Sequence, residues 1–356
     1  MEVLVLNTSF ETIAIIDKFE SLIWTDRYCG YGDFEIYAAA NNELFENTPQ
    51  DYYLWFRESE HMMIIEEKNI TSDVESGNHL KVVGRSLESI LDRRIVWKQT
   101  VLKGDFQTAI KKLINENIIS PSISARKISN FIFEDSTDPA ITELTIDAQF
   151  TGDTLYDAIK SLCEDHAIGF KITLNESNQF VFKLYAGTDR SYDQTENPYV
   201  VFSPNFENII NSNYYENKQP LKNVALVAGE GEGNSRKTAT VGSGSGLSRR
   251  ELYVDARDIS TETDEGKLTN SQYTAQLKQR GKEKLGENIF AKTFDGEVET
   301  SRMFVYGQDF FLGDVVQIIN EYGIEGKTRV DEMIISEDVN GSSAIPTFNA
   351  IETGNE

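Results

Sequence analysis

The glycine-rich stretch from residue 223 to 258 has the spacing that most suggests ligand chemistry. A strand-like run, Val224 to Ala228, leads into Gly229-Glu-Gly-Glu-Gly233. Such glycines bind phosphate when a helix follows them, because the first N–H groups of the helix and its dipole then face the ligand. A β-branched run, Lys237-Thr-Ala-Thr-Val241, follows instead, and a second strand is expected over Glu251 to Val254. The pattern therefore predicts strands joined by loops and not a nucleotide site.

Charged positions in the same stretch support this interpretation. A P-loop has glycine directly before its lysine, where this chain has Arg236. Glu230 and Glu232 would repel a phosphate at the place where it should bind. Residues 231–250 are interpreted as a Gly/Ser-rich connection, and weak order is expected from Gly231 to Gly246 in an isolated subunit.

Metal-binding patterns are weak throughout the chain. The three histidines are isolated, lack ligand spacing and are interpreted as satisfied or surface residues: His61, His79 and His166. Four acidic residues could be drawn together as a calcium cluster: Asp255, Asp258, Asp264 and Glu265. They lack the regular order of a calcium loop, so solvated carboxylates are the preferred interpretation and a metal is the alternative. We predict no metal and no cofactor.

Catalytic patterns are equally sparse. There is no G-x-S-x-G nucleophile motif, and no Cys/His/Asn set has supporting context. The 58 acidic residues could supply the carboxylate pair of a glycosidase, but nothing indicates which two. We predict no catalytic residue, and a hydrolase remains the alternative.

Composition restricts the classes of partner. Asp and Glu outnumber Lys and Arg by 58 to 34, a net charge of −24 that repels nucleic acid and anionic membranes unless a basic patch intervenes. Basic residues cluster only as pairs such as Arg93-Arg94, Lys111-Lys112 and Arg249-Arg250. No apolar run approaches the ~20 residues of a membrane helix, the N-terminus does not resemble a signal peptide, and Cys29 and Cys163 make no disulfide framework. We expect a soluble protein made in a reducing compartment.

The order of patterns predicts a mainly β chain with an α+β insertion. Residues 1–99 read as strands at the spacing of a small barrel or sandwich, and together with 199–230 they form the first predicted β-domain. Residues 100–198 form the predicted α+β domain, 231–250 the connection, and 251–356 a second β-domain with a long polar helix near 271–286. Asn270 is the expected cap of that helix, and Arg302 to Val305 is one of the strands expected after it.

Two helices are expected in the α+β domain. The first has Asp105 as its N-cap and an apolar face made of Ala109, Ile110, Leu113 and Ile114. The second starts near Thr151-Gly-Asp153, buries Leu155, Ile159, Leu162 and Cys163, and ends at Gly169. A hairpin of Phe170 to Leu174 and Gln179 to Tyr185 is expected to follow.

Four groups of segments carry a family resemblance: Trp24 to Tyr37, Val83 to Ile95, Tyr185 to Arg190 with Val200 to Ser203, and the glycine block with Arg249 to Arg257 and Asp309 to Val315. The motif residues within them and beside them are Trp24, Arg27, Gly32, Phe34, Gly84, Arg85, Asp189, Arg190, Gly229, Gly231, Gly233, Arg250, Asp255, Arg257, Phe311, Gly313 and Asp314. Together these segments resemble the tail-hub, or tail-associated, proteins of siphovirus-type long-tailed bacteriophages and prophages, which are similar to the baseplate hub of contractile tails.

The resemblance implies a fold and an assembly. It implies two tube-type β-barrel domains flanking the inserted α+β domain, and a homotrimer whose six barrels form a pseudo-hexameric ring that continues or closes the tail tube. Gly32 and Gly313 would make barrel corners, where a missing Cβ permits a sharp bend. Phe34, Ile36, Phe310 and Leu312 would fill barrel cores.

The resemblance also implies partners and a location. The partners are the distal tail protein, the tape-measure protein and receptor-binding proteins, with transient, non-specific passage of DNA and no membrane insertion by this chain alone. The location is the tail tip of the virion, after assembly in the host cytoplasm. Because the chain stops at Glu356, lytic or receptor-binding activity is expected on other chains. An acidic channel wall that does not bind DNA phosphate would give the net charge of −24 a purpose.

Two alternatives remain beside this structural role. One is a tail-tip carbohydrate or peptidoglycan hydrolase. The other is a receptor-binding module that stacks sugars on aromatic side chains such as Tyr52, Trp55, Tyr214 and Tyr215, although barrel packing explains most of these better.

Overall fold

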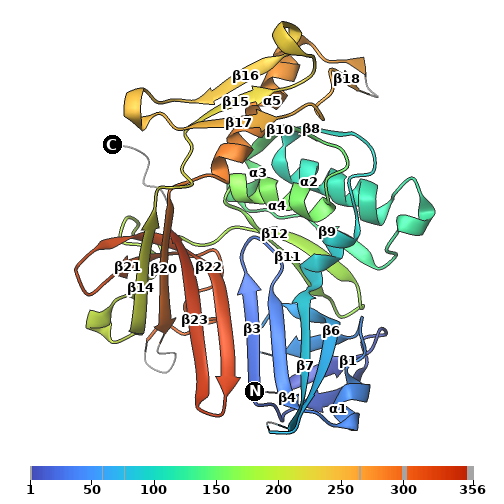
Figure 1. Ribbon diagram of the computed structural model, residues 1–356, viewed down its shortest axis with the longest axis vertical. Coiled ribbons are helices and arrows are strands. Elements are labelled where there is room, and N and C mark those ends of the chain that lie inside the picture. The colour runs from blue at the N-terminus through green and yellow to red at the C-terminus, as the bar shows by residue number, and fades with distance from the viewer. Residues whose placement is uncertain (1, 58, 76, 264–265, 299–302, 351–356) are drawn as a thin grey trace. The chain divides into compact units, whose positions relative to one another are not determined.

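The computed structural model describes residues 2–57, 59–75, 77–263, 266–298 and 303–350. They divide into two units: unit 1 comprises Met1–Ser89, Gly169–Tyr215 and Thr293–Glu356, and unit 2 comprises Ile90–Ile168 and Glu216–Lys292 (Figure 1). Three of the four boundaries fall within the 3-10 helix η1 (Leu87–Arg93), strand β14 (Ile209–Asn217) and strand β20 (Ala291–Val298), and the fourth lies between Ile168 and Gly169. Strands outnumber helices among the described residues, so the prediction of a mainly β chain is confirmed.

Unit 1 is built on one large sheet made of two strand groups. The first strand group contains β1 (Val3–Leu6), β2 (Thr12–Ile16), β3 (Ser21–Arg27), β4 (Asp33–Ala39), β5 (Tyr53–Phe56), β6 (Met62–Asp73) and β7 (Gly77–Ser86), with the short helix α1 (Asn42–Asn47). The second strand group contains β13 (Val201–Phe202), β14, β20, β21 (Val315–Ile319), β22 (Glu325–Asp338) and β23 (Gly341–Ala350). The hydrogen-bonded order is β14-β20-β23-β22-β3-β4-β7-β6-β5-β1-β2, with β21 beside β22 and β13 beside β21.

Strand β22 joins the two groups. It pairs antiparallel with β23 on one side and with β3 on the other, in a register that runs from Glu332 opposite Arg27 to Asp338 opposite Ser21. Strand β22 is long enough to pair with both β21 and β3, because β21 pairs with residues 325–329 of β22 and β3 pairs with residues 332–338. Backbone hydrogen bonds therefore make the two groups one continuous sheet.

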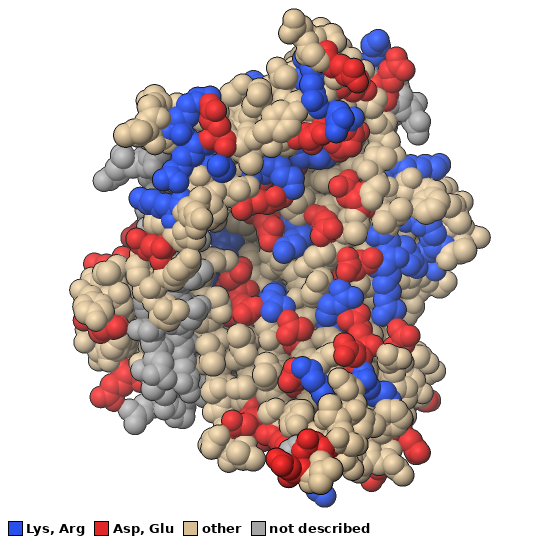
Figure 2. Space-filling view, in the orientation of Figure 1, with Lys and Arg blue, Asp and Glu red and all other residues tan. Residues whose placement is uncertain are grey.

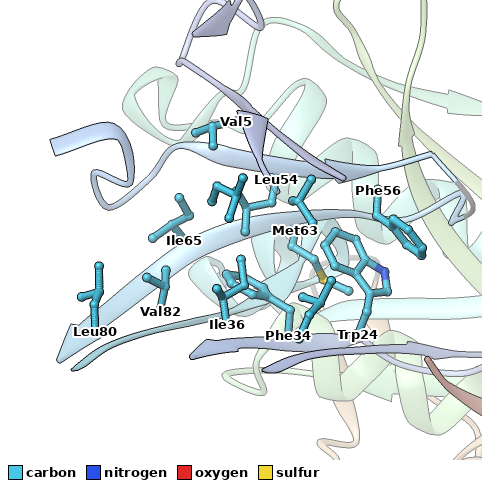
Figure 3. Close-up of a cluster of buried hydrophobic side chains, with 13 residues drawn as sticks. Val5, Trp24, Phe34, Ile36, Leu54, Phe56, Met63, Ile65, Leu80 and Val82 are labelled. Carbon is cyan, nitrogen blue, oxygen red and sulfur yellow. The ribbon is translucent and has the colours of Figure 1, made fainter. Parts of the chain in front are cut away.

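The first strand group encloses an apolar core because its strands alternate buried and outward-facing residues. Along β4, Phe34, Ile36 and Ala38 are buried, the residues between them are half-buried and Ala39 is exposed. Trp24 lies against the rings of Phe34 and Phe56, with ring centroids 6.1 and 5.6 Å away (Figure 3). Phe34 and Ile36 thus lie in a core, as predicted.

The second strand group has a separate core of aromatic side chains. The Phe202 ring meets Phe310 and Phe348 with centroids 5.1 and 5.3 Å apart. Phe310 is fully buried and Leu312 nearly so, as the sequence predicts. Beside these groups, β11 (Gly169–Leu174) and β12 (Phe180–Tyr185) form the predicted hairpin.

The first part of unit 2 is an α+β arrangement. It contains β8 (Thr100–Asp105), α2 (Phe106–Ile114), the π-helical turn η2 (Asn115–Ile119), η3 (Ser124–Arg126), β9 (Phe131–Glu134), α3 (Pro139–Thr142), β10 (Thr145–Phe150) and α4 (Leu155–Asp165). Asp105 accepts a hydrogen bond from the N–H of Thr108 at 2.7 Å, which confirms it as the N-cap of α2. The predicted apolar faces of α2 and α4 are buried.

The second part of unit 2 is a three-stranded sheet covered by one helix. The elements are β15 (Val224–Ala228), η5 (Gly233–Ser235), β16 (Thr238–Gly242), η6 (Gly246–Ser248), β17 (Glu251–Asp255), β18 (Glu262–Thr263), β19 (Gly266–Lys267) and α5 (Asn270–Gly286). Strand β15 lies between β16, antiparallel, and β17, parallel. Tyr273 and Leu277 of α5 pack on Ala225 and Val227 of β15, so this polar helix has one buried face.

The predicted domain boundaries need correction. The sequence predicts that residues 199–230 complete the first β-domain, but β13 pairs with β21, and β15 pairs with β16 and β17. It predicts residues 231–250 as a connection, but they contain β16 between η5 and η6. It starts the second β-domain at residue 251, whereas β17 and α5 belong to unit 2. All three differences have the same cause: a sequence pattern can indicate a strand, but it does not indicate which other strand it pairs with.

Smaller differences concern the ends of elements. Unit 2 takes its α+β part from residues 90–168, and the hairpin of β11 and β12 belongs to unit 1 instead of the predicted 100–198 domain. Helix α4 ends at Asp165, and Gly169 begins β11 instead of terminating the helix. Thr269, and not Asn270, caps α5. Of the strand predicted over 302–305, Arg302 lies outside the described residues and 303–305 form no strand.

Candidate functional site

A buried polar cluster lies in unit 1, where β3, the segment after β5, and η1 meet. Asp26, almost fully buried, accepts hydrogen bonds from Trp24 Nε1 at 3.1 Å and Ser59 Oγ at 2.7 Å. His61 Nδ1 lies 3.3 Å from Glu88 Oε1. Glu88 also accepts hydrogen bonds from the hydroxyl of Ser86 and, at 2.6 Å, from the N–H of Ile172.

The charges in this cluster depend on each other. Burial alone would lower the pKa of His61, but Asp26 and Glu88 outweigh it and raise that pKa to about 9. Burial likewise opposes the charged form of Glu88, yet His61 and the hydrogen bonds to the carboxylate lower its pKa. At Asp26 burial prevails and raises the pKa. A protonated His61 therefore stabilises a Glu88 carboxylate that would otherwise be buried without a counter-charge.

His61 also lines a pocket with a volume of about 340 Å³. Lys171, Tyr306 and Asp314 contribute to its wall, and Lys171 is ion-paired with Glu60 at its rim. Burial raises the pKa of Tyr306 well above its ordinary value, so its hydroxyl stays protonated at neutral pH. The charged groups here are paired with one another, which is the chemistry of a stabilised core and not of an activated nucleophile.

Two of the segments that carry the family resemblance, Tyr185 to Arg190 and Asp309 to Val315, are joined by Arg190 and Asp314. Arg190 Nε donates to Asp314 Oδ2 at 2.7 Å, and the N–H groups of Thr188 and Phe311 donate to the same carboxylate. Asp314 is nearly fully buried, so this charge-assisted arrangement fixes two distant segments together. Asp189 accepts from the N–H of Ser191 at 2.8 Å and shapes the following turn.

Gly313 is required by both its conformation and its surroundings. Its φ of 88° lies in the left-handed region, and a Cβ there would overlap the Tyr28 ring. Tyr28 packs edge-on against Tyr185 at 5.2 Å between ring centroids, and the Arg329 guanidinium lies 5.3 Å over it. The predicted corner at Gly313 is thus a close approach of backbone to a buried ring.

The motif residues of the first strand group lie around the β3–β4–β7 edge of the core. Arg27 forms ion pairs at 2.5 Å with both Asp33 and Glu332. Arg85 holds Glu66 through two hydrogen bonds of 2.7 and 2.8 Å. A Cβ at Gly84 would overlap the Ile64 carbonyl, opposite a register shift in β6. Gly32 donates its N–H to Ser86 Oγ at 2.8 Å and so adjoins the buried polar cluster.

The glycine block in unit 2 contains no phosphate cradle. Gly229 lies against the Tyr273 hydroxyl, which donates to the Ile259 carbonyl at 3.0 Å and accepts from the N–H of Glu230 at 2.8 Å. The Glu230 carboxylate accepts hydrogen bonds from the backbone and side chain of Thr261. Arg236 donates to the Gly229 carbonyl at 3.1 Å. These groups bind each other, and the block consists of strands and turns.

The remaining motif residues of this block lie at its outer side. Gly231 and Gly233 have φ values of 97° and 52° and form the turns after β15. Asp255 binds both Arg257 and Arg236, at 2.6 and 3.1 Å, and Arg250 donates to the Lys218 carbonyl. Of the four residues weighed as calcium ligands, Asp264 and Glu265 lie outside the described residues, while Asp258 pairs with Arg280. No metal-binding group of His, Cys, Asp and Glu occurs within the described part of the chain.

One buried carboxylate in unit 2 has the pKa that acid–base chemistry needs. Burial raises the pKa of Glu283 to about 7, against the opposing effect of Arg280, whose Nε lies 3.6 Å away. Glu283 lines a pocket of about 430 Å³ together with Asp157 and Glu164. Sequence reasoning missed it because a glutamate in a polar helix carries no sign of burial. Asp26 and Glu88 were missed too, because nothing in the sequence places them near His61.

No helix among the described residues has the length and apolar character needed to cross a membrane. Three aromatic residues weighed as sugar-stacking positions are partly exposed, Trp55 and the β14 residues Tyr214 and Tyr215, whereas Tyr52 packs against the first core.

Solved structures place this fold among phage tail proteins. A prophage tail protein of Listeria monocytogenes EGD-e is 13% identical with a TM-score of 0.57, covering 99% of this chain and 96% of that one. A tail protein of Neisseria meningitidis MC58 (13% identity, TM-score 0.58, 98% and 95% covered) and the 43 kDa tail protein of prophage MuSo2 of Shewanella oneidensis (13%, 0.58, 98% and 98%) are similar to the same extent. The chain thus has the fold of prophage tail proteins over nearly its whole length.

A family model then gives the narrower assignment. The model for the Siphovirus ReqiPepy6 Gp37-like protein matches residues 2–348, and the chain belongs to that family. The resemblance to a tail-associated family of long-tailed phages is confirmed. A search of curated protein sequences found no match.

Proposed function

We propose that this chain is a structural hub protein at the tip of a siphovirus-type tail, where three copies form a ring that continues or closes the tail tube. The observation that carries the proposal is the fold match to prophage tail proteins over 98–99% of the chain. In this proposal each strand group of unit 1 is one tube-type barrel, so a trimer presents six. The continuous β22–β3 pairing supports it, because it joins the two strand groups within one chain.

The proposed ring docks on the distal tail protein, receives the end of the tape-measure protein and lets DNA pass; receptor-binding proteins attach from outside. Assembly takes place in the host cytoplasm before the virion is complete. The excess of carboxylates supports an acidic channel wall that does not retain DNA. A reconstructed ring whose channel is neutral or basic, with the acidic residues outside, would refute this part of the proposal.

A non-enzymatic role is part of the proposal, and Glu283 provides its test. A carboxyl group with a pKa of about 7 beside other carboxylates is what a tail-tip hydrolase would use as a general acid. Purified wild-type protein should leave peptidoglycan uncleared in a zymogram. Clearing that Glu283→Gln abolishes, while Glu287→Gln retains it, would establish the hydrolase instead.

The oligomeric state tests the structural role in solution. Light scattering should give three times the 40.2 kDa of one chain, either alone or once the distal tail protein is added. A strictly monomeric protein that degrades polysaccharide would contradict the proposal. Loss of adsorption without loss of tail assembly, after substituting Trp55, Tyr214 and Tyr215, would instead support the receptor-binding alternative.

A further inference from the structure

An apolar area on unit 2 is exposed where the chain enters β8. Ile95, Trp97 and Ile123 are 40%, 54% and 39% exposed, and the three line one pocket of about 360 Å³. A second pocket of about 340 Å³ begins on Trp97 and continues along Lys98 and Lys112. Exposed apolar side chains that cluster around an aromatic ring are typical of a binding surface.

Cations surround this apolar area. The Arg126 guanidinium lies 5.1 Å over the Trp97 ring and lines both pockets. Arg94 donates to the Arg126 carbonyl at 3.1 Å, and Lys98 is exposed beside Trp97. Figure 2 shows Lys and Arg side chains gathered at its right-hand edge, over the segment that follows α2. We call Arg94, Ile95, Trp97, Lys98, Ile123 and Arg126 the basic patch.

Two carboxylates, Asp92 and Glu116, line the pockets of the basic patch, but neither forms an ion pair with Arg94 or Arg126. Elsewhere Arg27, Arg85 and Arg190 each bind a carboxylate at 2.5 to 2.7 Å. Arg94 and Arg126, in contrast, donate to backbone carbonyls and an amide, and neither forms an ion pair with a carboxylate of the described residues. Burial and then the nearby charge of Arg94 lower the pKa of Arg126. Like charges held together without a direct carboxylate ion pair favour an anionic partner.

The patch is also held in place before any partner binds. Asn117, buried in the π-helical turn η2, accepts from the N–H of Trp97 at 3.3 Å and from Arg126 Nη2 at 3.2 Å. Arg126 also donates to the Ile95 carbonyl at 2.6 Å. Preorganised side chains lose little freedom on binding, which favours affinity.

We propose that the basic patch is a docking surface for an acidic protein segment whose apolar side chains enter the pockets beside Trp97. The apolar centre decides between a protein and a phosphate polymer. A polyphosphate chain would use the cations and leave Ile95 and Ile123 unused, whereas a peptide with Phe or Leu between Asp and Glu residues satisfies both parts. The proposal is independent of the proposed hub function, because it concerns a local surface of unit 2.

The test is a selection of short random peptides on the purified full-length chain, with counter-selection on the Trp97→Ala/Lys98→Glu double variant. The surviving peptides should carry net negative charge and at least one aromatic or leucine side chain. They should bind wild type about ten-fold more tightly than the double variant or Lys98→Glu alone, and less tightly as salt rises. Lys98 is exposed, so the single variant retains the fold. Lys267→Glu, an equal charge change at an exposed site, should alter binding less than about two-fold.

Three outcomes would overturn the proposal. One is that no peptide distinguishes wild type from the variants. Another is that the selected peptides are neutral or basic. The third is that oligothymidylate or inorganic polyphosphate binds with a dependence on Trp97 and Lys98 that the peptides lack, which would assign the patch to a phosphate polymer.

Discussion

His61 lies among the buried carboxylates Asp26 and Glu88, which raise its pKa to about 9. Removing one member of a buried charged pair leaves the other without compensation, which typically costs about 3–5 kcal/mol. His61, interpreted from the sequence as a satisfied or surface histidine, is buried, and its Nδ1 lies 3.3 Å from Glu88 Oε1. The carboxylates could not be predicted, because their proximity is created by tertiary packing.

The stability of the protein should fall between pH 6.5 and 9 because of His61. Its folded-state pKa of about 9 lies above its ordinary 6.5, so the stabilisation is complete below 6.5 and is lost as the pH rises through 9. We expect His61→Gln to be less stable at pH 6.5 by about 3 kcal/mol, with the difference shrinking toward pH 9. Urea unfolding across this range measures it, with His79→Gln as the control. A constant difference would disprove the charge coupling.

Glu283 should also make the stability of the protein fall as the pH rises, but at a lower pH than His61 does. Its raised pKa, about 7 instead of 4.5, means that the folded state favours the neutral acid, so stability is lost as the pH rises through 7. Glu283→Gln keeps the neutral shape and should stabilise the protein at pH 8 by about 1–3 kcal/mol, with no difference at pH 4. Glu287→Gln, at a more exposed site, should change stability by less than about 0.5 kcal/mol. Destabilisation at pH 8 would show that the Arg280 ion pair outweighs burial.

At the scale of elements, the sequence patterns correctly predicted those features that depend only on residues close together in the chain. The N-cap at Asp105, the buried faces of α2 and α4, and the β11–β12 hairpin each depend on neighbouring residues and are confirmed. Strand β15 was recognised as a strand but assigned to the wrong sheet. Pairing is decided by which apolar faces meet across the fold, and here α5 supplies the face that covers β15. The β22–β3 pairing escaped prediction for the same reason.

The junction of β3, β4 and β22 should depend on Arg27. It is the residue that ion-pairs with Asp33 beside it and with Glu332 across the strand pairing. Arg27→Ala should cost about 1 kcal/mol, because the side chain is only partly shielded from solvent. Lys81→Ala, which removes a more exposed ion pair with Glu35, should cost less than about 0.5 kcal/mol. Equal effects of the two substitutions in urea unfolding would show that Arg27 has no special role in joining the strand groups.

At the scale of the whole molecule, the family resemblance predicted the class of protein but not how the chain is divided into two units. In a chain with a net charge of −24, arginines such as Arg94 and Arg126 that form no ion pair among the described residues are informative. The two units alternate along the chain, which no run of composition reveals. The glycine block shows most clearly what the sequence could not predict, because residues 231–250, predicted as a connection, contain the paired strand β16.

The central claim is that three copies of this chain form a ring at the end of the tail tube. Cryo-electron microscopy of purified tails tests it most directly. We expect density for three copies around the tail axis at the distal end, with six strand groups of unit 1 lining the channel. Tails in which this chain is absent from the axis, or present only in peripheral fibres, would contradict the account.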